Sequence, residues 1–210
     1  MKCMIDKEKK WRKKKMENGK IYEIRWHGRG GQGTVTAAKI LGAVAFAEGY
    51  KGVQSIPLIG AERRGSPIKV FSRISRDQIR IHSQIYEPDI VICIDPSLFA
   101  DYKNIVIEGL KEDGILIVNT IEDPSKIELG KNFEVCTVDA TGISVQLGLE
   151  FGGAYVVNAP MLGAIAKVTK FISLEGLMKN LGKKWKGEWG EKIQKAVKMA
   201  YEQLKCIRGV

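Results

Sequence analysis

The chain has 210 residues, 44% of them apolar and 28% charged. This composition is typical of a globular protein, and the chain is long enough to bury a core without disulfide cross-links. Its four cysteines, at positions 3, 93, 136 and 206, include no Cys-x-x-Cys pair. This spacing argues against a zinc ribbon, a cysteine-held iron–sulfur cluster and a secreted disulfide framework, and we expect a reducing, cytoplasmic compartment. With no apolar run of about 18 residues and only two histidines, a membrane span and a histidine metal site are not expected.

The net charge of +10 is unevenly distributed along the chain. Residues 1–20 hold nine lysines and arginines against three acidic residues, and residues 167–210 hold eleven against four. Residues 21–166 are slightly acidic, with fourteen basic and seventeen acidic side chains. A nucleic-acid binder normally carries its basic stripe through the fold, so no nucleic-acid partner is expected. We expect residues 1–19 to form a basic, disordered leader and residues 20–210 a single α/β domain.

The first half of the sequence predicts several strands and one helix. Residues 21–26 alternate apolar and polar side chains as a strand does, and residues 34–48 repeat apolar side chains about every 3.6 positions as a helix does. Further strands are expected at 53–58, at 68–74 and, more briefly, at 79–81.

The second half predicts buried strands followed by helices. Continuous apolar runs at 90–94, 114–119 and 133–138 are typical of strands covered on both faces. Residues 99–110 are expected to be partly helical, and a short helix is expected at 141–149.

Helices are expected to dominate the C-terminal end. Asn158 and Ser173 are each expected to cap a helix. Residues 185–190 look like a Gly/Trp/Lys linker before a surface helix at 191–205. The order of elements predicts an α/β class, a Rossmann-like three-layer fold with a mostly parallel sheet and C-terminal helices.

A glycine-dense turn links the first strand to the first helix. It consists of Gly28, Arg29, Gly30, Gly31, Gln32, Gly33 and Thr34, and its glycines match G-x-G-x-x-G. In this position the pattern predicts a phosphate cradle, because glycines let an anion approach the free N–H groups of a helix N-terminus. The same residues also fit a turn that only packs the helix closely against the strand.

The remaining parts of a dinucleotide site are not found. Such a site carries an acidic residue about 20 positions further on, at the end of the second strand, to bind the ribose hydroxyls. Here that strand ends at Leu58 and Ile59, while Glu48 falls on the helix and Glu62 in the loop beyond. NAD binding is therefore disfavoured, and a free-standing nucleotide-binding enzyme remains the alternative.

Other catalytic motifs are missing from the sequence as well. It has no G-x-S-x-G nucleophile elbow, no H-E-x-x-H motif and no G-D-G-type thiamine diphosphate–Mg²⁺ motif. His27 and His82 suit structural roles as well as catalytic ones, and Asp95 ends a buried strand, where it fits a ligand site or a turn cap. The pair Arg63-Arg64 fits a phosphate, a carboxylate or a salt bridge between subunits.

Five blocks of the sequence point together to one family. They are IRWHGRGGQGTVTAA at 24–38, GAERRGSPIKVFSRI at 60–74, SQIYEPDIVICIDPSL at 83–98, DGILIVNT at 113–120 and NAPMLGAIAKVT at 158–169. In this order they resemble the γ subunit of 2-oxoacid:ferredoxin oxidoreductases, and the later blocks are similar to the pyruvate and branched-chain members. The resemblance covers about residues 20–205.

The resemblance implies one subunit of a pyruvate synthase-type complex. Such complexes convert pyruvate, coenzyme A and oxidised ferredoxin to acetyl-CoA, CO₂ and reduced ferredoxin. In that family thiamine diphosphate, Mg²⁺ and the iron–sulfur clusters belong to partner subunits, here expected to be of the α, β and δ types. The isolated chain is therefore expected to be inactive and to contribute no catalytic residue, and the choice between pyruvate and branched-chain substrates stays open.

Two loops carry the site residues that the resemblance implies. The family's glycine loop maps onto residues 28–34, the candidate cofactor-binding site, with a phosphate of coenzyme A as its candidate ligand. The family's E-R-R-G loop maps onto Glu62, Arg63, Arg64 and Gly65, the candidate subunit interface. Both loops are expected to face partner subunits near the active site of the complex.

Overall fold

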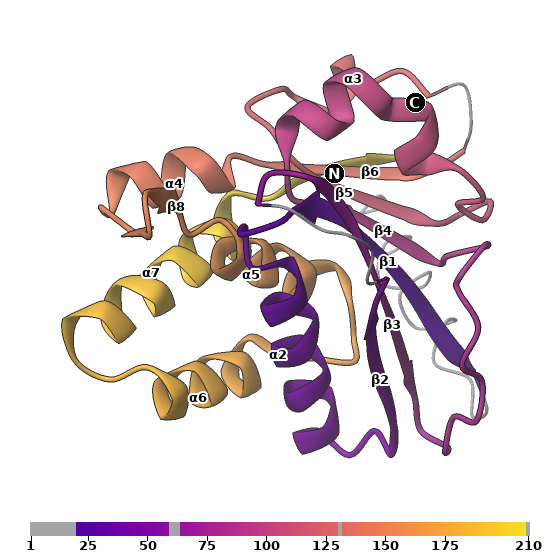
Figure 1. Ribbon diagram of the computed structural model, residues 1–210, viewed down its shortest axis with the longest axis horizontal. Coiled ribbons are helices and arrows are strands. Elements are labelled where there is room, and N and C mark those ends of the chain that lie inside the picture. Colours follow the sequence, from indigo (N-terminus) through magenta and orange to yellow (C-terminus); the bar gives the residue numbers. More distant parts are fainter. Residues whose placement is uncertain (1–19, 59–63, 130–131, 209–210) are drawn as a thin grey trace, which may run out of the picture.

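The structure is a computed structural model that describes residues 20–58, 64–129 and 132–208. The expected leader at 1–19 lies outside these ranges, as do Glu62 and Arg63. Within them a central sheet is covered on one face by the single helix α3 (Pro96–Ile107) and on the other by the remaining α-helices (Figure 1).

The sheet has seven strands in the order β2-β3-β1-β4-β5-β6-β9. They are β1 (Ile21–Arg29), β2 (Gly52–Pro57), β3 (Pro67–Ser75), β4 (Ile90–Cys93), β5 (Ile115–Asn119), β6 (Glu134–Val138) and β9 (Lys205–Arg208). The central strands β1, β4, β5 and β6 run parallel, while β2, β3 and β9 join the edges in antiparallel pairings. The predicted α/β class with a parallel centre and C-terminal helices is confirmed.

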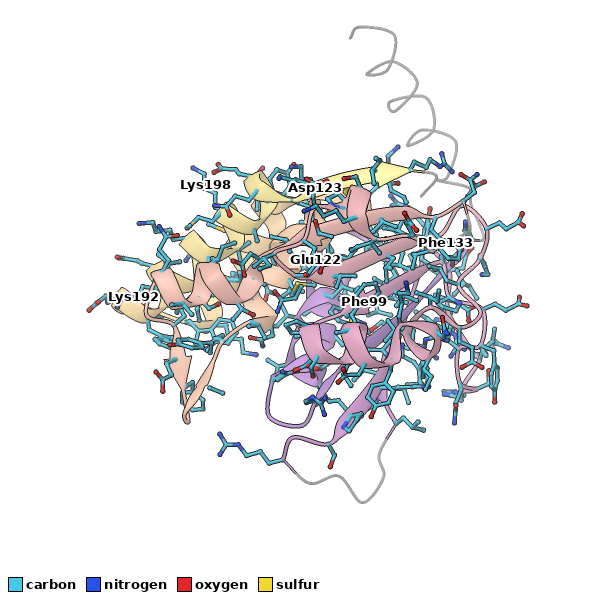
Figure 2. All side chains as sticks on the ribbon, turned by 90° about the horizontal axis from the view of Figure 1, so that it is seen from above. Phe99, Glu122, Asp123, Phe133, Lys192 and Lys198 are labelled. Atoms are coloured by element: carbon cyan, nitrogen blue, oxygen red, sulfur yellow. A yellow bond between two sulfur atoms is a disulfide. The ribbon has the colours of Figure 1, made fainter. Side chains whose placement is uncertain are left out.

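The larger layer of helices covers the face to which Trp26 of β1 points. It consists of α2 (Thr34–Ala47), α4 (Ala140–Gln146), α5 (Asn158–Val168), α6 (Leu174–Lys184) and α7 (Gly187–Gln203). Apolar side chains from these helices and from one face of the sheet are buried together in the main core. On α7, Lys192 and Lys198 lie on the outer side of this layer (Figure 2).

A smaller core lies between the sheet and α3. Leu98, Phe99 and Val106 of the helix pack with Val91 and Leu116 of the strands, and Figure 2 shows Phe99 on this helix. The alternation of β4 explains the division, since Ile90 and Ile92 point into the main core and Val91 into the smaller one. Among the described residues, no helix is long and apolar enough to span a bilayer.

The chain leaves β1 and β4 toward opposite faces of the sheet. β1 continues into α2 in the larger layer, and the neighbouring parallel strand β4 continues into α3. Where the connections of two adjacent parallel strands diverge, α/β proteins bind ligands in a crevice at the carboxyl ends of the strands. The glycine loop at 28–34 lies at this position.

Some of the expected local structure is wrong. Residues 79–81 do not form a strand, and Ile79 instead accepts a hydrogen bond from the Gln54 side chain through its carbonyl oxygen at 3.5 Å. Residues 185–190 are not a linker, because α7 already begins at Gly187. The short hairpin β7–β8 (Glu150–Phe151 and Ala154–Tyr155) was not expected.

The two expected helix caps differ in outcome. Ser173 does cap α6, since its Oγ accepts a hydrogen bond from Gly176 N at 2.9 Å. Asn158 does not cap α5 but is its first residue. Its Nδ2 donates to the carbonyl oxygen of Gly33 at 3.2 Å, so the side chain joins α5 to the start of α2.

The cysteines are not all reduced, contrary to expectation. Cys136 on β6 and Cys206 on β9 stand opposite each other in the sheet and form a disulfide with an S–S distance of 2.03 Å. The pair is separated by 70 residues, and only the register of β9 brings it together. Sequence spacing does not reveal such a pair because β9 itself has no recognisable strand pattern.

Gly163 lets α5 and α7 pack at close range, which gives a test of the fold. A Cβ at this position would meet the carbonyl oxygen of Val197 at 2.1 Å. Gly163→Ala should therefore lower the free energy of unfolding by about 1–3 kcal/mol, although alanine favours helix. In the matched variant Gly182→Ala the Cβ meets the flexible Gln194 side chain at 3.2 Å, so stability should hold or rise. Urea denaturation compares them, and equal loss in both variants would contradict this packing.

Candidate functional site

The two segments that the sequence analysis singled out lie side by side in the structure. Gly30 N donates to the Ser66 carbonyl oxygen at 2.9 Å, and Gly65 N donates to the Gly30 carbonyl oxygen at 3.0 Å. These main-chain hydrogen bonds join the glycine loop to the E-R-R-G loop at 62–65, called the second loop below, of which Arg64 and Gly65 are described. They place Arg64 beside Gly31, where a Cβ on Gly31 would lie 3.5 Å from the Arg64 Cγ.

The carboxylate of Asp95 organises the crevice between β1 and β4. It accepts a hydrogen bond from Leu98 N at 3.1 Å as the N-cap of α3, and from Arg29 Nε at 3.3 Å. The side chains of Gln32 and Ser97 also donate to it. Burial acts to raise the pKa of Asp95, but these donors hold it below its ordinary value. The crevice therefore already contains a negative charge that belongs to the protein.

Arg29 and Gln32 hold the loop in shape. The Gln32 side chain donates to Asp95 through Nε2 and accepts from Arg29 N through Oε1 at 2.8 Å. The Arg29 guanidinium donates to Ser97 Oγ at 2.8 Å and to the Gly65 carbonyl oxygen at 3.1 Å, besides Asp95. Both side chains were candidates for ligand contact, and the structure places both among partners within the protein.

The glycines of the loop have different roles. A Cβ on Gly28 would lie 2.2 Å from Thr34 Oγ1, and a Cβ on Gly33 would lie 2.5 Å from Asn158 Nδ2. These two glycines allow β1, α2 and α5 to approach one another, as the packing interpretation expects. Gly31 has a φ of +95°, which only glycine adopts readily, and it lines an open pocket. Gly33 shares the positive φ and the pocket but packs against Asn158, whereas the nearest neighbour of Gly31 is the flexible side chain of Arg64.

A pocket of about 320 Å³ lies beside the glycine loop. Its polar lining comes from the N-terminal ends of α2 and α5, and includes Gly31, Gln32, Gly33, Thr36 and Asn158. Its aromatic lining comes from the β7–β8 hairpin and from the junction of α6 with α7, and consists of Phe151, Tyr155, Trp185 and Trp189. Helix N-termini favour an anion, and aromatic rings favour a flat or apolar group. The pocket suits a ligand that has both parts.

The start of α2 is also short of hydrogen-bond partners. Its N-cap residue Gly33 has no side chain, and within the described ranges no side chain caps the helix. The N–H groups of the first turn have no acceptor inside the helix and are open to an external one. The Thr34 hydroxyl is buried and has no hydrogen-bond partner in the described part of the chain. The first-turn N–H groups are the donors that a phosphate at the loop would use, whereas the Thr34 hydroxyl lies against Gly28 and does not line the pocket.

Sequence reasoning missed the aromatic half of this pocket. The hairpin residues Phe151 and Tyr155 remain 78% and 43% exposed, which is unusual for large side chains. Trp185 and Trp189 lie within the segment 185–190 that was expected to be a linker. An exposed hairpin of two-residue strands has no periodic pattern, so the sequence offers no signal beyond the aromatic residues themselves.

His27 is a buried structural residue. Arg25 Nε donates to its Nε2 at 3.1 Å, and Arg25 also donates to the carbonyl oxygens of Val106 and Glu108 at the end of α3. Burial, with the positive charges of Arg25 and Lys69, lowers the pKa of His27 to about 3. The imidazole is neutral at pH 7 and serves as an acceptor for Arg25. His82, by contrast, is exposed.

This neutral histidine makes stability depend on pH. His27 titrates near 6.5 when unfolded and near 3 when folded, so the unfolded chain binds one more proton between these values. The contribution of neutral His27 to the free energy of unfolding is complete above about pH 6.5 and is lost as the pH falls toward 3. Between pH 7 and pH 5 this loss is about 2 kcal/mol. His27→Gln keeps an acceptor that does not titrate. Between pH 7 and pH 5 the free energy of unfolding of this variant should therefore fall by about 2 kcal/mol less than that of the unmodified chain. Urea denaturation at both pH values measures it, and an identical pH dependence would contradict a neutral His27.

The fold and the loop define a Rossmann-like α/β domain with a glycine-rich loop at the point where β1 and β4 diverge. The family model described as pyruvate ferredoxin/flavodoxin oxidoreductase matches residues 23–203. Pyruvate synthase subunit PorC of Methanocaldococcus jannaschii is 44% identical over 184 residues, which cover 88% of this chain and 97% of that protein. The pyruvate/ketoisovalerate oxidoreductases common subunit gamma of Pyrococcus abyssi is 47% identical over 192 residues, which cover 89% and 99%.

Solved structures agree with these relatives. Pyruvate oxidoreductase subunit PORC of Thermotoga maritima has a TM-score of 0.76 and 37% identity, and the match covers 89% of this chain and 98% of that one. The 2-oxoglutarate:ferredoxin oxidoreductase of Magnetococcus marinus shares the fold with a TM-score of 0.70 at 17% identity, over 31% of its chain. The chain described here belongs to the pyruvate ferredoxin/flavodoxin oxidoreductase family.

Proposed function

We propose that the chain is the γ subunit of a multi-subunit pyruvate:ferredoxin oxidoreductase. The complex would make acetyl-CoA, CO₂ and reduced ferredoxin from pyruvate, coenzyme A and oxidised ferredoxin. The observation that carries this proposal is the likeness, over 89% of this chain, to the γ subunit of Pyrococcus abyssi and the PorC subunit of Thermotoga maritima, at 47% and 41% identity. The alternative of a free-standing nucleotide-binding enzyme is not favoured, since Glu48 bonds Ser173 instead of facing the loop.

In this proposal, subunits of the α, β and δ types work with the chain in the cytoplasm, and ferredoxin accepts the electrons. Thiamine diphosphate, Mg²⁺ and the iron–sulfur clusters belong to those partners, so the oxidative decarboxylation takes place on them. The glycine loop, Arg64 and the exposed rings of Phe151 and Tyr155 would form the contact surface. Support comes from the grouping of exposed aromatic side chains beside a cation, a composition typical of protein interfaces.

Within this function, the glycine loop and its pocket are the proposed contact for coenzyme A. That substrate combines phosphates with an apolar arm and a planar adenine, which matches the two kinds of pocket lining. The open N–H groups of α2 and the nearby Arg64 suit a phosphate. Because the Asp95 carboxylate fills the crevice between β1 and β4, the phosphate is proposed to lie on the pocket side of the loop. The chain would thus hold coenzyme A while its thiol extends to the partner's active site.

Replacing Arg64 tests this contact. Its guanidinium donates to the carbonyl oxygen of Gly152 at the tip of the hairpin, and the residue is exposed in the isolated chain. Arg64→Ala should leave the melting temperature of the free subunit within about 2 °C, as surface changes usually do. In the assembled complex it should raise the KM for coenzyme A about ten-fold, the effect of one lost charge-assisted hydrogen bond, without changing the KM for pyruvate.

The matched control is Arg80→Ala, an exposed arginine in the segment that follows β3. It should leave the KM for coenzyme A and assembly unchanged. If Arg64→Ala weakens assembly instead, on size-exclusion chromatography, the second loop is a protein contact only. If both variants behave like the unmodified chain, neither the coenzyme A contact nor the interface is at this loop.

A further inference from the structure

The disulfide that joins β9 to the sheet has two halves in different environments. Cys136 on β6 is fully buried in the main core, whereas Cys206 on β9 is exposed. The antiparallel register sets the two residues directly opposite, with their Cα atoms 4.1 Å apart. Thiol–disulfide exchange begins when a thiolate attacks a sulfur that it can reach. Cys206 is the exposed residue of the pair, so an external thiolate would approach the bond from its side.

Besides the disulfide, β9 is held by main-chain pairing with β6 and by exposed side-chain contacts. The strand has only four residues, all of them exposed, and forms the edge of the sheet. Each end of the strand forms an ion pair. Lys205 pairs with Asp123 at 3.3 Å, and Arg208 pairs with Asp113. Figure 2 shows Asp123 beside this strand. Exposed ion pairs contribute little, and a four-residue strand at the edge of a sheet opens locally at low cost. The disulfide is the covalent attachment of β9, added to its main-chain pairing with β6.

The chain immediately before β9 is fixed independently of the disulfide. Leu204 is buried in the main core. Lys167 Nζ donates to the carbonyl oxygen of Glu202 at 3.2 Å and to that of Leu204 at 3.0 Å. A break of the disulfide would release β9 from β6 while α7 stays in place. The segment that responds is thus limited to residues 205–208.

We propose that Cys136 and Cys206 form a redox site that attaches β9 to the sheet when oxidised and releases it when reduced. The co-substrate is a dithiol. Its thiolate attacks Cys206 Sγ, the Cys136–Cys206 bond breaks, and Cys136 takes up a proton and stays buried as a thiol. The second thiol of the reductant then displaces Cys206, which becomes a thiol as the reductant closes to a cyclic disulfide. Two electrons and two protons enter the protein, and glutathione disulfide reverses the change.

Release of β9 has a defined structural result. The residues of β6 that pair with β9 would expose their outward backbone N–H and C=O groups, from Glu134 to Thr137. An open strand edge of this kind accepts another strand. On its other side β6 pairs in parallel with β5, and that pairing does not involve either cysteine. Reduction should therefore change the edge of the sheet and leave its centre intact.

Peptide mapping of the full chain, purified without reductant and alkylated in denaturant, tests the bond itself. We expect a peptide that links Cys136 to Cys206, with Cys93 alkylated as a free thiol. After treatment with dithiothreitol, Cys136 and Cys206 should be alkylated as well as Cys93. If Cys136 and Cys206 are both alkylated even after incubation with glutathione disulfide, the redox site does not exist.

Hydrogen exchange measured by mass spectrometry tests the release. Reduction should speed exchange at least ten-fold in residues 134–137 and 205–208 and leave β4 and β5 unchanged. Cys206→Ser, at an exposed position, should exchange like the reduced protein with or without dithiothreitol. Lys205→Ala is the matched control, since it removes an ion pair of the same strand and keeps the bond, and it should exchange like the oxidised protein. Equal exchange in the oxidised and reduced states would overturn the proposal.

Discussion

The carboxylate of Asp95 connects the three segments from which the candidate site is built. It caps α3 through Leu98 N, holds Arg29 and Gln32 of the glycine loop, and through Arg29 reaches the Gly65 carbonyl oxygen of the second loop. Because these donors surround a buried carboxylate, removing the charge would leave several of them without an acceptor. The shape of the glycine loop thus depends on a residue 66 positions away from Arg29.

This arrangement changes how the glycine loop works. In a dinucleotide-binding fold the crevice between the diverging strands receives the phosphates. Here the crevice contains the carboxylate of the protein, and the open backbone of Gly31 and the start of α2 instead face the aromatic pocket. The proposed site therefore lies away from the centre of the sheet, on a surface shared by α2, α5 and the β7–β8 hairpin. A surface of this kind is suited to a subunit that presents a substrate to a partner.

The sequence predicted those parts of the fold that follow from local patterns. The apolar runs that became β4, β5 and β6 were recognised because strands buried on both faces leave a continuous signal. The hairpin at 150–155 and β9 were missed because short, exposed strands have no alternation to detect. The Asn158 side chain was expected to accept hydrogen bonds from its own helix, but its Nδ2 donates to the carbonyl oxygen of Gly33, 125 positions away.

The candidate site was predicted to a similar extent. The glycine loop and the second loop were located, and their main-chain pairing through Gly30 and Gly65 brings them together. The roles of Arg29 and Gln32 within the loop did not follow from the sequence, because they depend on the distant Asp95. The same holds for the disulfide, which the register of the last strand creates.

The most direct test of the account is to isolate the chain from its native source by an affinity tag and to assay the two resulting fractions. The account predicts that the chain copurifies with larger subunits that carry iron–sulfur clusters, and that only this fraction reduces ferredoxin in a reaction requiring both pyruvate and coenzyme A. The chain alone should be folded and inactive. Turnover by the purified single chain, or isolation of the chain without any such partner, would contradict the assignment as a γ subunit.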